Sequence, residues 1–586
     1  MFLFTVTHHS IIPELHLQGV EEYRVENLFF TLYTRGGMPE VTDTREALGI
    51  VEAPGISGRR GLHRDASGIW YDTRNKELQL YRTFVSGRPV YYHISADGDL
   101  YCSTHIRLLR EAGVPIEENS EVLPEYFVYR YVFPPATLFS DISQVPAGSS
   151  LLFTLRDGRL TLKETCDYSP PEKMESGDFD LHEIVEQVKE NLTGILESAD
   201  ALGQPLTLLL SGGLDSSILT QIAHTRYGVN DTYSTDYPFE NPEANREREY
   251  AITAGEALGV NHHYQRFTTE EYLHGFIRAL AVAEVPVSHL QSVPLFLLMN
   301  RHFGPEEATV LFGTSADNNF GSHEHLKFRK ASGIDRSPLS GLAAQSYPVL
   351  QTLVNAVDKG YHFIEPLKYV GSTSLPVTDP DHYLWRMKAY GSEEWACRFF
   401  GVNREDIIRS RLEWLDRYED LSLYDILSLY FAVGASANTQ EIWSKFGEEN
   451  GKGAIYPYSN AELLDLSFSI PWKTKLREKK YLLRKTARKL GVPEFIITRP
   501  KSGFGINAEK WARRGTALEP LVPLASKVID EDEIRALQSA DSKLSMSYWN
   551  LLNYAVWKRL WIDGEPVEDL QEELSEVRDR TESVSE

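Results

Sequence analysis

The sequence predicts an α/β protein built from a β-rich N-terminal domain and a larger C-terminal domain with a parallel sheet. Short β-like runs separated by turn residues fill positions 1–168. Further along, the apolar run 206–210 leads through a glycine turn into a segment of helical periodicity. Such an order is typical of the opening of a parallel α/β domain. Helical spacing beyond residue 405 predicts a helical C-terminal part.

Composition narrows the class of protein. The 586 residues carry a net charge of −24, which argues against a general binder of nucleic acids. No window approaches 18 uninterrupted apolar residues, so we expect no membrane-spanning segment. The three cysteines are widely spaced, which is typical of a reducing cytoplasm and predicts neither a disulfide framework nor a thiolate zinc site.

The elements follow in order along the chain. The N-terminal domain begins with an expected strand at residues 1–9 and continues through runs such as 78–82 and 150–155. The polar, proline-bearing segment 169–179 is predicted to be a linker. In the C-terminal domain, 180–564, strands are expected at 206–210, 231–235 and 308–312. The tail 565–586 is acidic and lacks aromatic residues, so we expect it to be disordered.

Residues 211–217, with the sequence SGGLDSS, have the composition of a phosphate-binding turn. Two glycines let successive N–H groups point into one concavity, and the following helix adds its positive N-terminal end. Asp215 is a candidate Mg²⁺ ligand beside the phosphates. An ordinary glycine turn with serine caps is the alternative. The candidate phosphate-binding residues are Ser211, Gly212, Gly213, Asp215, Ser216 and Ser217.

This string after a hydrophobic strand resembles the PP-loop of the ATP-pyrophosphatase superfamily, which grips the departing pyrophosphate. The block 311–321 resembles the G-E-G-A-D-E-L-F-G-G-Y block of asparagine synthetase. The resemblance implies ATP and Mg²⁺ as cofactors. It also implies that Gly313 contacts the nucleotide and that Asp317 is the second Mg²⁺ ligand beside Asp215.

Three more segments support the same resemblance. Lys480 begins a run similar to the family's K-x-x-L-R helix, and Lys501 lies in a segment similar to R-x-K-x-G-F. The family's lysine at the position of Lys501 stabilises phosphate charge, and Lys480 is implied as a weaker catalytic candidate. Glu284 stands in an E-x-P context that implies orientation of substrate or base; a structural cap is an equal alternative.

Residues 87–92 and 145–148 resemble turns of the family's glutaminase-type domain, which implies an Ntn-type α/β/β/α fold for the N-terminal part. A working glutaminase of this class uses an N-terminal cysteine. Here position 2 is Phe2 and the first cysteine is Cys102, so no thiol stands at the required place. We therefore expect a scaffold or substrate-recognition domain and a nitrogen source other than glutamine.

The acceptor side also departs from the family. Thr314 stands where asparagine synthetase has a glutamate, and a threonine hydroxyl is no ordinary general base. This combination resembles lasso-peptide cyclases, and β-lactam synthetase is a relative that also lacks the cysteine. It implies a cytoplasmic ATP-dependent ligase that adenylates a small-molecule or peptide carboxylate, releases AMP and pyrophosphate, and forms a macrolactam or another natural-product amide. A precursor peptide or companion biosynthetic enzyme is an expected partner, whereas nucleic acid and membrane are not.

Three alternatives remain open at this point. The chain can be an ammonia-dependent asparagine synthetase. It can carry out another PP-loop chemistry such as tRNA modification or sulfur transfer, which the acidic balance disfavours. It can also be a non-catalytic nucleotide-binding partner protein, a role that needs none of Asp215, Asp317 and Lys501.

Overall fold

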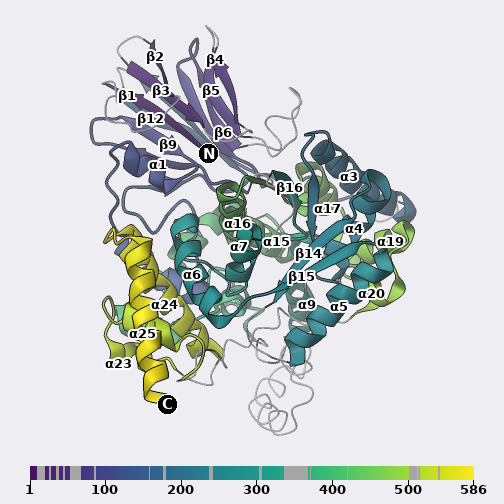
Figure 1. Cartoon of the computed structure of the whole chain (residues 1–586). Helices are drawn as coiled ribbons and strands as arrows, with labels where there is room; N and C mark the ends of the chain where they lie inside the picture. Colours follow the sequence, from purple (N-terminus) through teal and green to yellow (C-terminus); the bar gives the residue numbers. More distant parts are fainter. Residues whose placement is uncertain are drawn as a thin grey trace.

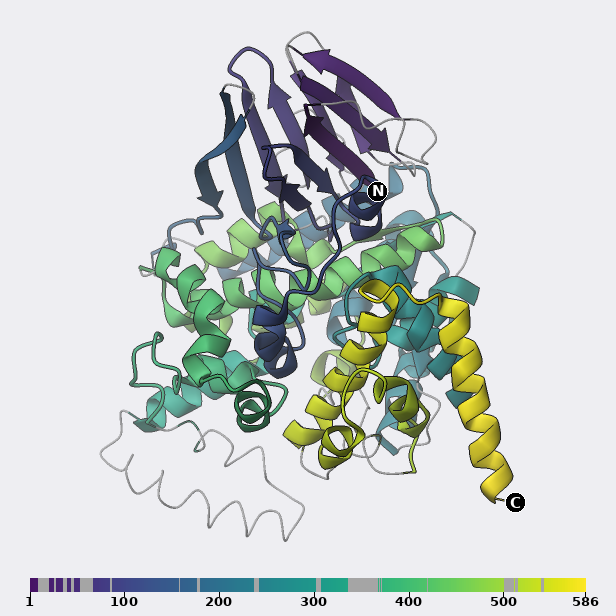
Figure 2. The ribbon, with the colours of Figure 1, turned by 90° about the vertical axis from the view of Figure 1, so that its left-hand side faces the viewer.

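A computed structural model of the chain shows three β-sheets and a set of helices packed between and around them (Figures 1 and 2). It describes residues 1–8, 20–25, 28–34, 39–43, 47–52, 67–84, 87–156, 159–175, 180–236, 242–301, 307–335, 367, 369, 371–418, 420–499, 511, 515–538 and 542–585.

The N-terminal part is a sandwich of two antiparallel sheets. One sheet has the order β10-β8-β9-β1-β3-β2 and the other β12-β11-β7-β6-β5-β4. The side chains of alternate residues point between the sheets, and Phe4, Ile69 and Phe153 form part of that inner core. The strands are β1 (Phe2–Thr7), β2 (Glu21–Val25), β3 (Leu28–Thr34), β4 (Pro39–Asp43), β5 (Ala47–Glu52), β6 (Ser67–Asp72), β7 (Glu77–Arg82), β8 (Tyr91–Ile94), β9 (Leu100–Ser103), β10 (Ser143–Gln144), β11 (Ser149–Arg156) and β12 (Arg159–Asp167).

Two short helices, α1 (Ile106–Glu111) and α2 (Leu123–Tyr129), lie between β9 and β10 in the sequence. Both contact the C-terminal domain: Arg110 donates to the Trp561 carbonyl and Tyr126 to the Asn550 carbonyl. The segment before α3 does not hang free. Lys173 donates to the Phe468 carbonyl, and the N–H of Met174 donates to the Ser469 carbonyl at 2.8 Å. The expected linker is therefore packed along the C-terminal domain over its described residues.

The C-terminal domain contains a five-stranded parallel sheet of order β15-β14-β13-β16-β17. Its strands are β13 (Leu206–Leu209), β14 (Asp231–Asp236), β15 (Asn261–Arg266), β16 (Ala308–Leu311) and β17 (Lys452–Ile455). The strands expected at 206–210, 231–235 and 308–312 are confirmed, together with the α/β fold class. The strands β15 and β17 were not anticipated.

Helices cover both faces of this sheet. Leu208 and Leu311 face one core, and Val310 and Phe312 face the other. The first core is covered by α3 (Leu181–Asp200), α4 (Leu214–Tyr227) and α19 (Tyr481–Leu490), and the second by α6 (Thr269–Ala283), α7 (Ser292–Arg301) and α16 (Ala437–Glu449). Buried strands between two helical layers explain the continuous apolar runs in the sequence.

The expected helical C-terminal part is confirmed. The further helices that the structure describes in this domain are α5 (Pro242–Leu258), α8 (Ala316–Phe320), α9 (His323–Asp335), α12 (Tyr383–Lys388), α13 (Glu393–Phe400), α14 (Arg404–Leu415), α15 (Leu423–Phe431), α17 (Ala461–Ser469), α18 (Trp472–Lys475), α20 (Glu494–Thr498), α22 (Val522–Ala525), α23 (Glu531–Ala536) and α24 (Ser542–Trp561). Among the described helices, none combines the length and the apolar character that crossing a lipid bilayer requires.

The tail corrects one expectation. Instead of a disordered segment 565–586, the structure contains helix α25 (Val567–Ser585), drawn in yellow in Figure 1. Leu570 and Leu574, one turn apart, are fully buried in the largest core. Glu573 pairs with the buried Arg559 at 2.7 Å. The apolar face of α25 is narrow. It is enough to hold the helix in place, because its leucines pack against a core formed by the rest of the molecule.

Candidate nucleotide-binding site

The glycine turn lies between β13 and α4, at the carboxyl end of a central strand. Gly212 has φ +67°, and a Cβ atom added to it would lie 2.5 Å from the Tyr250 carbonyl oxygen. No other residue fits this turn without displacing the backbone of α5. Gly213 is the N-cap of the 14-residue helix α4, so the free N–H groups of its first turn point toward the same place.

Two of the three predicted serines take part in this turn. The Ser216 hydroxyl accepts from the Ser211 N–H at 3.2 Å and lies 3.1 Å from the Ser211 hydroxyl, which in turn accepts from the Gly213 N–H at 3.3 Å. Ser217 is different, because it is fully buried and its Oγ lacks a hydrogen-bond partner. The structure therefore places Ser211 and Ser216 on the turn and Ser217 in the interior.

Three predicted residues from distant parts of the sequence meet beside the turn. The Lys480 ammonium lies 2.5 Å from Asp215 Oδ2 and 3.0 Å from Asp317 Oδ1. Lys480 is the N-cap of α19 and has φ +54°, a conformation that a lysine adopts only where its surroundings impose it. Gly313, which follows β16, lies close against the start of α4. A Cβ atom added to it would lie 3.2 Å from the Ser216 nitrogen.

The chemistry of this group fits a nucleotide with Mg²⁺. The second oxygen of Asp215, Oδ1, is buried and has no hydrogen-bond partner among the described residues, so the carboxylate has an oxygen available to a ligand. Carboxylate oxygens are the ligands that Mg²⁺ prefers, usually one or two together with phosphate oxygens. In the described part of the chain, no three His, Cys, Asp or Glu side chains gather to hold a metal by themselves. Asp215 and Asp317 would hold Mg²⁺ jointly with the nucleotide.

Lys501 lies outside the described residues, so its role stays a prediction. The chain leading to it is fixed at the turn by Arg499. The Arg499 guanidinium donates to the Ser211 carbonyl at 3.3 Å, pairs with Glu247 at 2.5 Å, and lies 3.8 Å from the centre of the Tyr250 ring.

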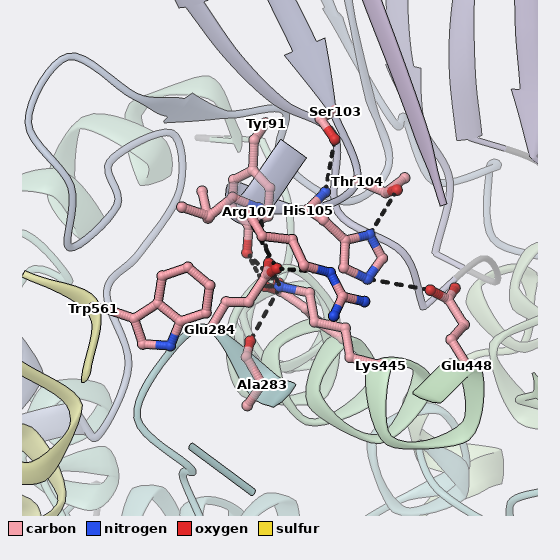
Figure 3. A network of polar contacts seen from close by, with 12 residues as sticks. Tyr91, Ser103, Thr104, His105, Arg107, Ala283, Glu284, Lys445, Glu448 and Trp561 are labelled. Carbon is pink, nitrogen blue, oxygen red and sulfur yellow. Dashed lines mark hydrogen bonds and ion pairs between the residues drawn. The ribbon is translucent and has the colours of Figure 1, made fainter. Parts of the chain in front are cut away.

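Glu284 does not join this group. Its fully buried carboxylate accepts from the N–H groups of Ile106, at 2.8 Å, and Arg107, at 3.3 Å, at the start of α1, and it pairs with Lys445 at 2.9 Å (Figure 3). Burial raises the pKa of Glu284, but Lys445, His105 and Arg107 outweigh it and hold that pKa below its ordinary value. The contacts are those of a structural cap, one of the two alternatives that the sequence left open.

The acceptor side of Asp317 is lined by amides and hydroxyls. The Gln440 amide donates to Ser315 Oγ at 3.0 Å and to Ser459 Oγ at 2.8 Å. Asn318 donates to Ser436 Oγ at 2.6 Å, at the end of a π-helical turn over Ala432–Ser436. Sequence reasoning missed Gln440 and Ser436, because their partners Ser315 and Asn318 are far away from them in the sequence.

A second group that the sequence did not reveal lies around Tyr390. The Arg130 guanidinium lies 3.6 Å from the centre of the Tyr390 ring, and its Nε has no hydrogen-bond partner. Lys388 lies over the Phe431 ring at 3.6 Å and 3.9 Å from Glu324. Burial raises the pKa of Tyr390, but the two cations outweigh it, so that this pKa is lowered.

The N-terminal domain has no thiol at the position expected of a glutaminase nucleophile. Phe2 stands there, fully buried, and its N–H donates to the Thr104 hydroxyl at 3.1 Å. Cys102 is opposite Phe4 in the neighbouring strand and is fully buried. Burial raises the pKa of the Cys102 thiol well above its ordinary value, so the reactive thiolate does not form.

Comparison with known proteins agrees with this geometry. The family model for asparagine synthase matches residues 201–559, and a glutamine amidotransferase domain matches residues 57–164. The chain is 22% identical over 515 residues to glutamine-hydrolyzing asparagine synthetase 1 of Bacillus subtilis strain 168, covering 84% of this chain and 76% of that one.

It is also similar to a putative glutamine-hydrolyzing asparagine synthetase of Mycobacterium tuberculosis strain H37Rv, with 22% identity over 551 residues, 86% of this chain and 78% of the other. A putative glutamine-hydrolyzing asparagine synthetase 2 of Methanocaldococcus jannaschii is 21% identical over 322 residues, 53% of this chain and 58% of the other.

Proposed function

Because the chain belongs to the asparagine synthase family, we propose that it activates a carboxylate as an acyl-adenylate and transfers the acyl group to an amine without hydrolysing glutamine. Membership of the family makes the chain an ATP-dependent C–N ligase. The observation that carries the proposal is the meeting of Lys480, Asp215 and Asp317 beside the glycine turn.

In this scheme the turn binds the phosphates of ATP. The N–H groups at the start of α4 and the hydroxyls of Ser211 and Ser216 hold the pyrophosphate as it leaves. Asp215 and Asp317 would hold Mg²⁺, which would supply positive charge that neutralises the phosphates. The substrate carboxylate attacks the α-phosphorus of ATP, and pyrophosphate leaves. Lys480, already fixed between the two carboxylates, places its positive charge where negative charge develops.

The second step is expected to depend on positioning. An acyl-adenylate is already reactive, and a nearby amine needs correct orientation more than further activation. Besides the lysines that pair with Asp317, the neutral Gln440 and Ser436 contact the turn around it, and Thr314 replaces the family's glutamate. With no general base at the position of Thr314, this side of the site suits an amine that is positioned by the substrate molecule to which it belongs.

We therefore propose a small-molecule or peptide carboxylate and an amine of the same or a second molecule as substrates. Macrolactam or another natural-product amide formation, as in lasso-peptide cyclases, is the first candidate, with a precursor peptide or companion enzyme as partner and the cytoplasm as location. Ammonia-dependent asparagine formation is the second candidate, because the names of the relatives give asparagine as their product, although those relatives are named as glutamine-hydrolyzing.

Pyrophosphate release with Mg²⁺ and ATP tests the proposal over a set of carboxylates and amines, aspartate with ammonium included. Lys480→Met should lower pyrophosphate release by about 100-fold or more, the effect of losing one charge-stabilising donor. Lys485→Met is the control, because Lys485 lies on the same helix and its ammonium lies over the Tyr481 ring, 5.2 Å from the ring centre. Release of orthophosphate alone, or an unchanged rate in Lys480→Met, contradicts the proposal.

A further inference from the structure

Helix α16 carries a row of buried charged residues that bind the N-terminal domain. Glu441 accepts from the Gln144 amide at 2.8 Å and from the Tyr91 hydroxyl. One turn later, Lys445 donates to the Tyr91 hydroxyl at 3.4 Å and pairs at 2.9 Å with Glu284, whose carboxylate accepts from the first N–H of α1. Figure 3 shows Lys445, Glu284 and Tyr91 from close by.

The same row ends at Glu448, which receives two groups from the N-terminal domain. Arg88 donates to Glu448 Oε1, and His105 Nε2 lies 3.2 Å from Oε2. Arg88 and Glu448 are both about nine-tenths buried, so water screens this pair little. Together the three contacts fix α16 both along its axis and about it.

The first turn of α16 contacts the candidate site instead. The Gln440 amide donates to Ser315 Oγ, and Ser315 immediately precedes α8, the five-residue helix that contains Asp317. Ser315 has φ +71°, and its side chain makes no capping hydrogen bond to α8. A helix this short has little stability of its own, so contacts from neighbouring elements decide where it lies.

A second contact reaches the same residue. Gly87 of the N-terminal domain lies against the Tyr456 ring, where an added Cβ would come within 2.5 Å of a ring carbon. The Tyr456 hydroxyl donates to the Gln440 carbonyl at 2.8 Å and lies 2.9 Å from Ser444 Oγ. The Gln440 carbonyl is therefore held by a tyrosine whose ring the N-terminal domain touches.

We propose that Gln440 is a positioning residue through which the docked N-terminal domain fixes the turn that carries Asp317. The inference rests on the proposed function only in giving that turn a catalytic purpose. It also explains why a glutaminase-like domain without a nucleophile is packed so closely on the synthetase domain. The relay runs along one rigid helix, since Gln440 and Glu448 are separated by about 12 Å at 1.5 Å per residue.

Amide hydrogen exchange of the full chain without ligand tests the relay independently of catalysis. Gln440→Met removes both side-chain donors, and Glu448→Gln removes the charge at the far end of the helix. Each should raise exchange in residues 315–320 by about 10-fold, because the turn then opens more often. Lys558→Met is the matched control: Lys558 pairs with Glu118 at 2.7 Å and ties the two domains together away from α16, so it should leave this peptide unchanged.

The double variant decides between a relay and two separate effects. Sites this far apart normally contribute independently. In a relay, Gln440→Met with Glu448→Gln should raise exchange no more than the larger single change, and the rate of pyrophosphate release should show the same non-additivity. Multiplying effects, or an unchanged 315–320 peptide in Glu448→Gln, would overturn the inference. Should Gln440→Met not fold, Gln440→Asn takes its place in the double variant. Arg88→Met and Glu448→Gln then each report how exchange in residues 315–320 depends on the contact at the far end of α16.

Failure of the proposed function has a different signature. In that case no carboxylate releases pyrophosphate in the wild type, while the exchange measurements still report whether the turn depends on Glu448. If the wild type turns over normally, but the effects of Gln440→Met and Glu448→Gln multiply in both hydrogen exchange and pyrophosphate release, the relay is contradicted and the proposed function is not.

Discussion

At the residue scale, His325 shows how the hydrogen bonds around the site fix a protonation state. Its Nδ1 accepts from the Ser322 N–H at 3.2 Å, so this nitrogen carries no proton. Its Nε2 lies 3.1 Å from Ser428 Oγ, which uses its own proton on the Asn318 carbonyl at 2.6 Å. Nε2 is therefore the donor, and the imidazole is neutral. Burial, and next Lys475, lower the pKa of His325 from 6.5 to about 3.

This predicts a loss of stability in mild acid. Between about pH 6.5 and pH 3, His325 binds a proton in the unfolded chain but stays neutral in the folded chain. The free energy of unfolding therefore decreases as the pH falls through this range. The expected slope from this residue approaches ~1.4 kcal/mol per pH unit. Urea denaturation from pH 7 to 5 should show a shallower slope in His325→Asn than in the wild type. Equal slopes would show that His325 titrates normally.

Residue types in short motifs allowed much of the candidate site to be predicted. Asp215, Asp317 and Lys480 lie together beside the turn, and each could be singled out because it stands in a short run that resembles a motif of the family; what each does there stays a prediction. Glu284 could be placed only as one of two alternatives, because its partners Ile106 and Lys445 come from elements far away in the sequence. Local patterns carry no record of such partners.

At the scale of elements, α25 shows how composition can mislead. Leu574 and Leu570 are buried against the core, while exposed acids lie on other faces of the helix: Glu568, Asp569, Glu572, Glu576 and Asp579. We predict that Leu574→Ala lowers the free energy of unfolding by ~2–5 kcal/mol, the range for deleting a buried leucine side chain. Chemical denaturation measures this, with Glu572→Ala, an exposed neighbour on the same helix, expected within ~0.5 kcal/mol of the wild type. A similar small change in both variants would mean that α25 is not packed.

The strands missed from the sequence share a physical cause. β15 is an edge strand of polar and aromatic residues, largely accessible, so it has neither the apolar run nor the alternation that predicts a strand. β17 is a fully buried strand of four residues beginning with Lys452. In both cases pairing with a neighbouring strand, rather than local preference, determines the conformation.

At the scale of the whole molecule, the two domains share one core. Phe127 of the N-terminal part packs against Trp395 and Tyr554 of the C-terminal part, with ring centres 5.3 Å and 5.4 Å apart. The sequence predicted the two domains, and the boundaries at 168 and 180 stay predictions. The sequence did not predict this contact. An interface between domains depends on which surfaces meet, and the apolar periodicity of a helix or a strand does not reveal that.

Glu284 gives a test of that contact. Glu284→Gln removes the nearer of the two carboxylates that the buried Lys445 ammonium pairs with and leaves Glu441 at 3.6 Å; breaking a buried pair costs up to ~3–5 kcal/mol. We expect a clearly lower thermal midpoint for the whole chain, measured by calorimetry. Glu449→Gln is the control, since Glu449 is largely exposed and its contact with Arg107 spans 3.5 Å. Equal midpoints for the two variants would contradict the structural role of Glu284.

The charged row on α16 has a consequence for the way such proteins can be recombined. Its acids match cations on the N-terminal sandwich one by one: Arg88 meets Glu448, and Arg82 lies 3.8 Å from Glu441. A chimaera that joins this sandwich to the synthetase part of a relative would bury unmatched ions unless it also took α16 from this chain. The natural unit of exchange is thus the sandwich plus a helix that lies nearly three hundred residues downstream.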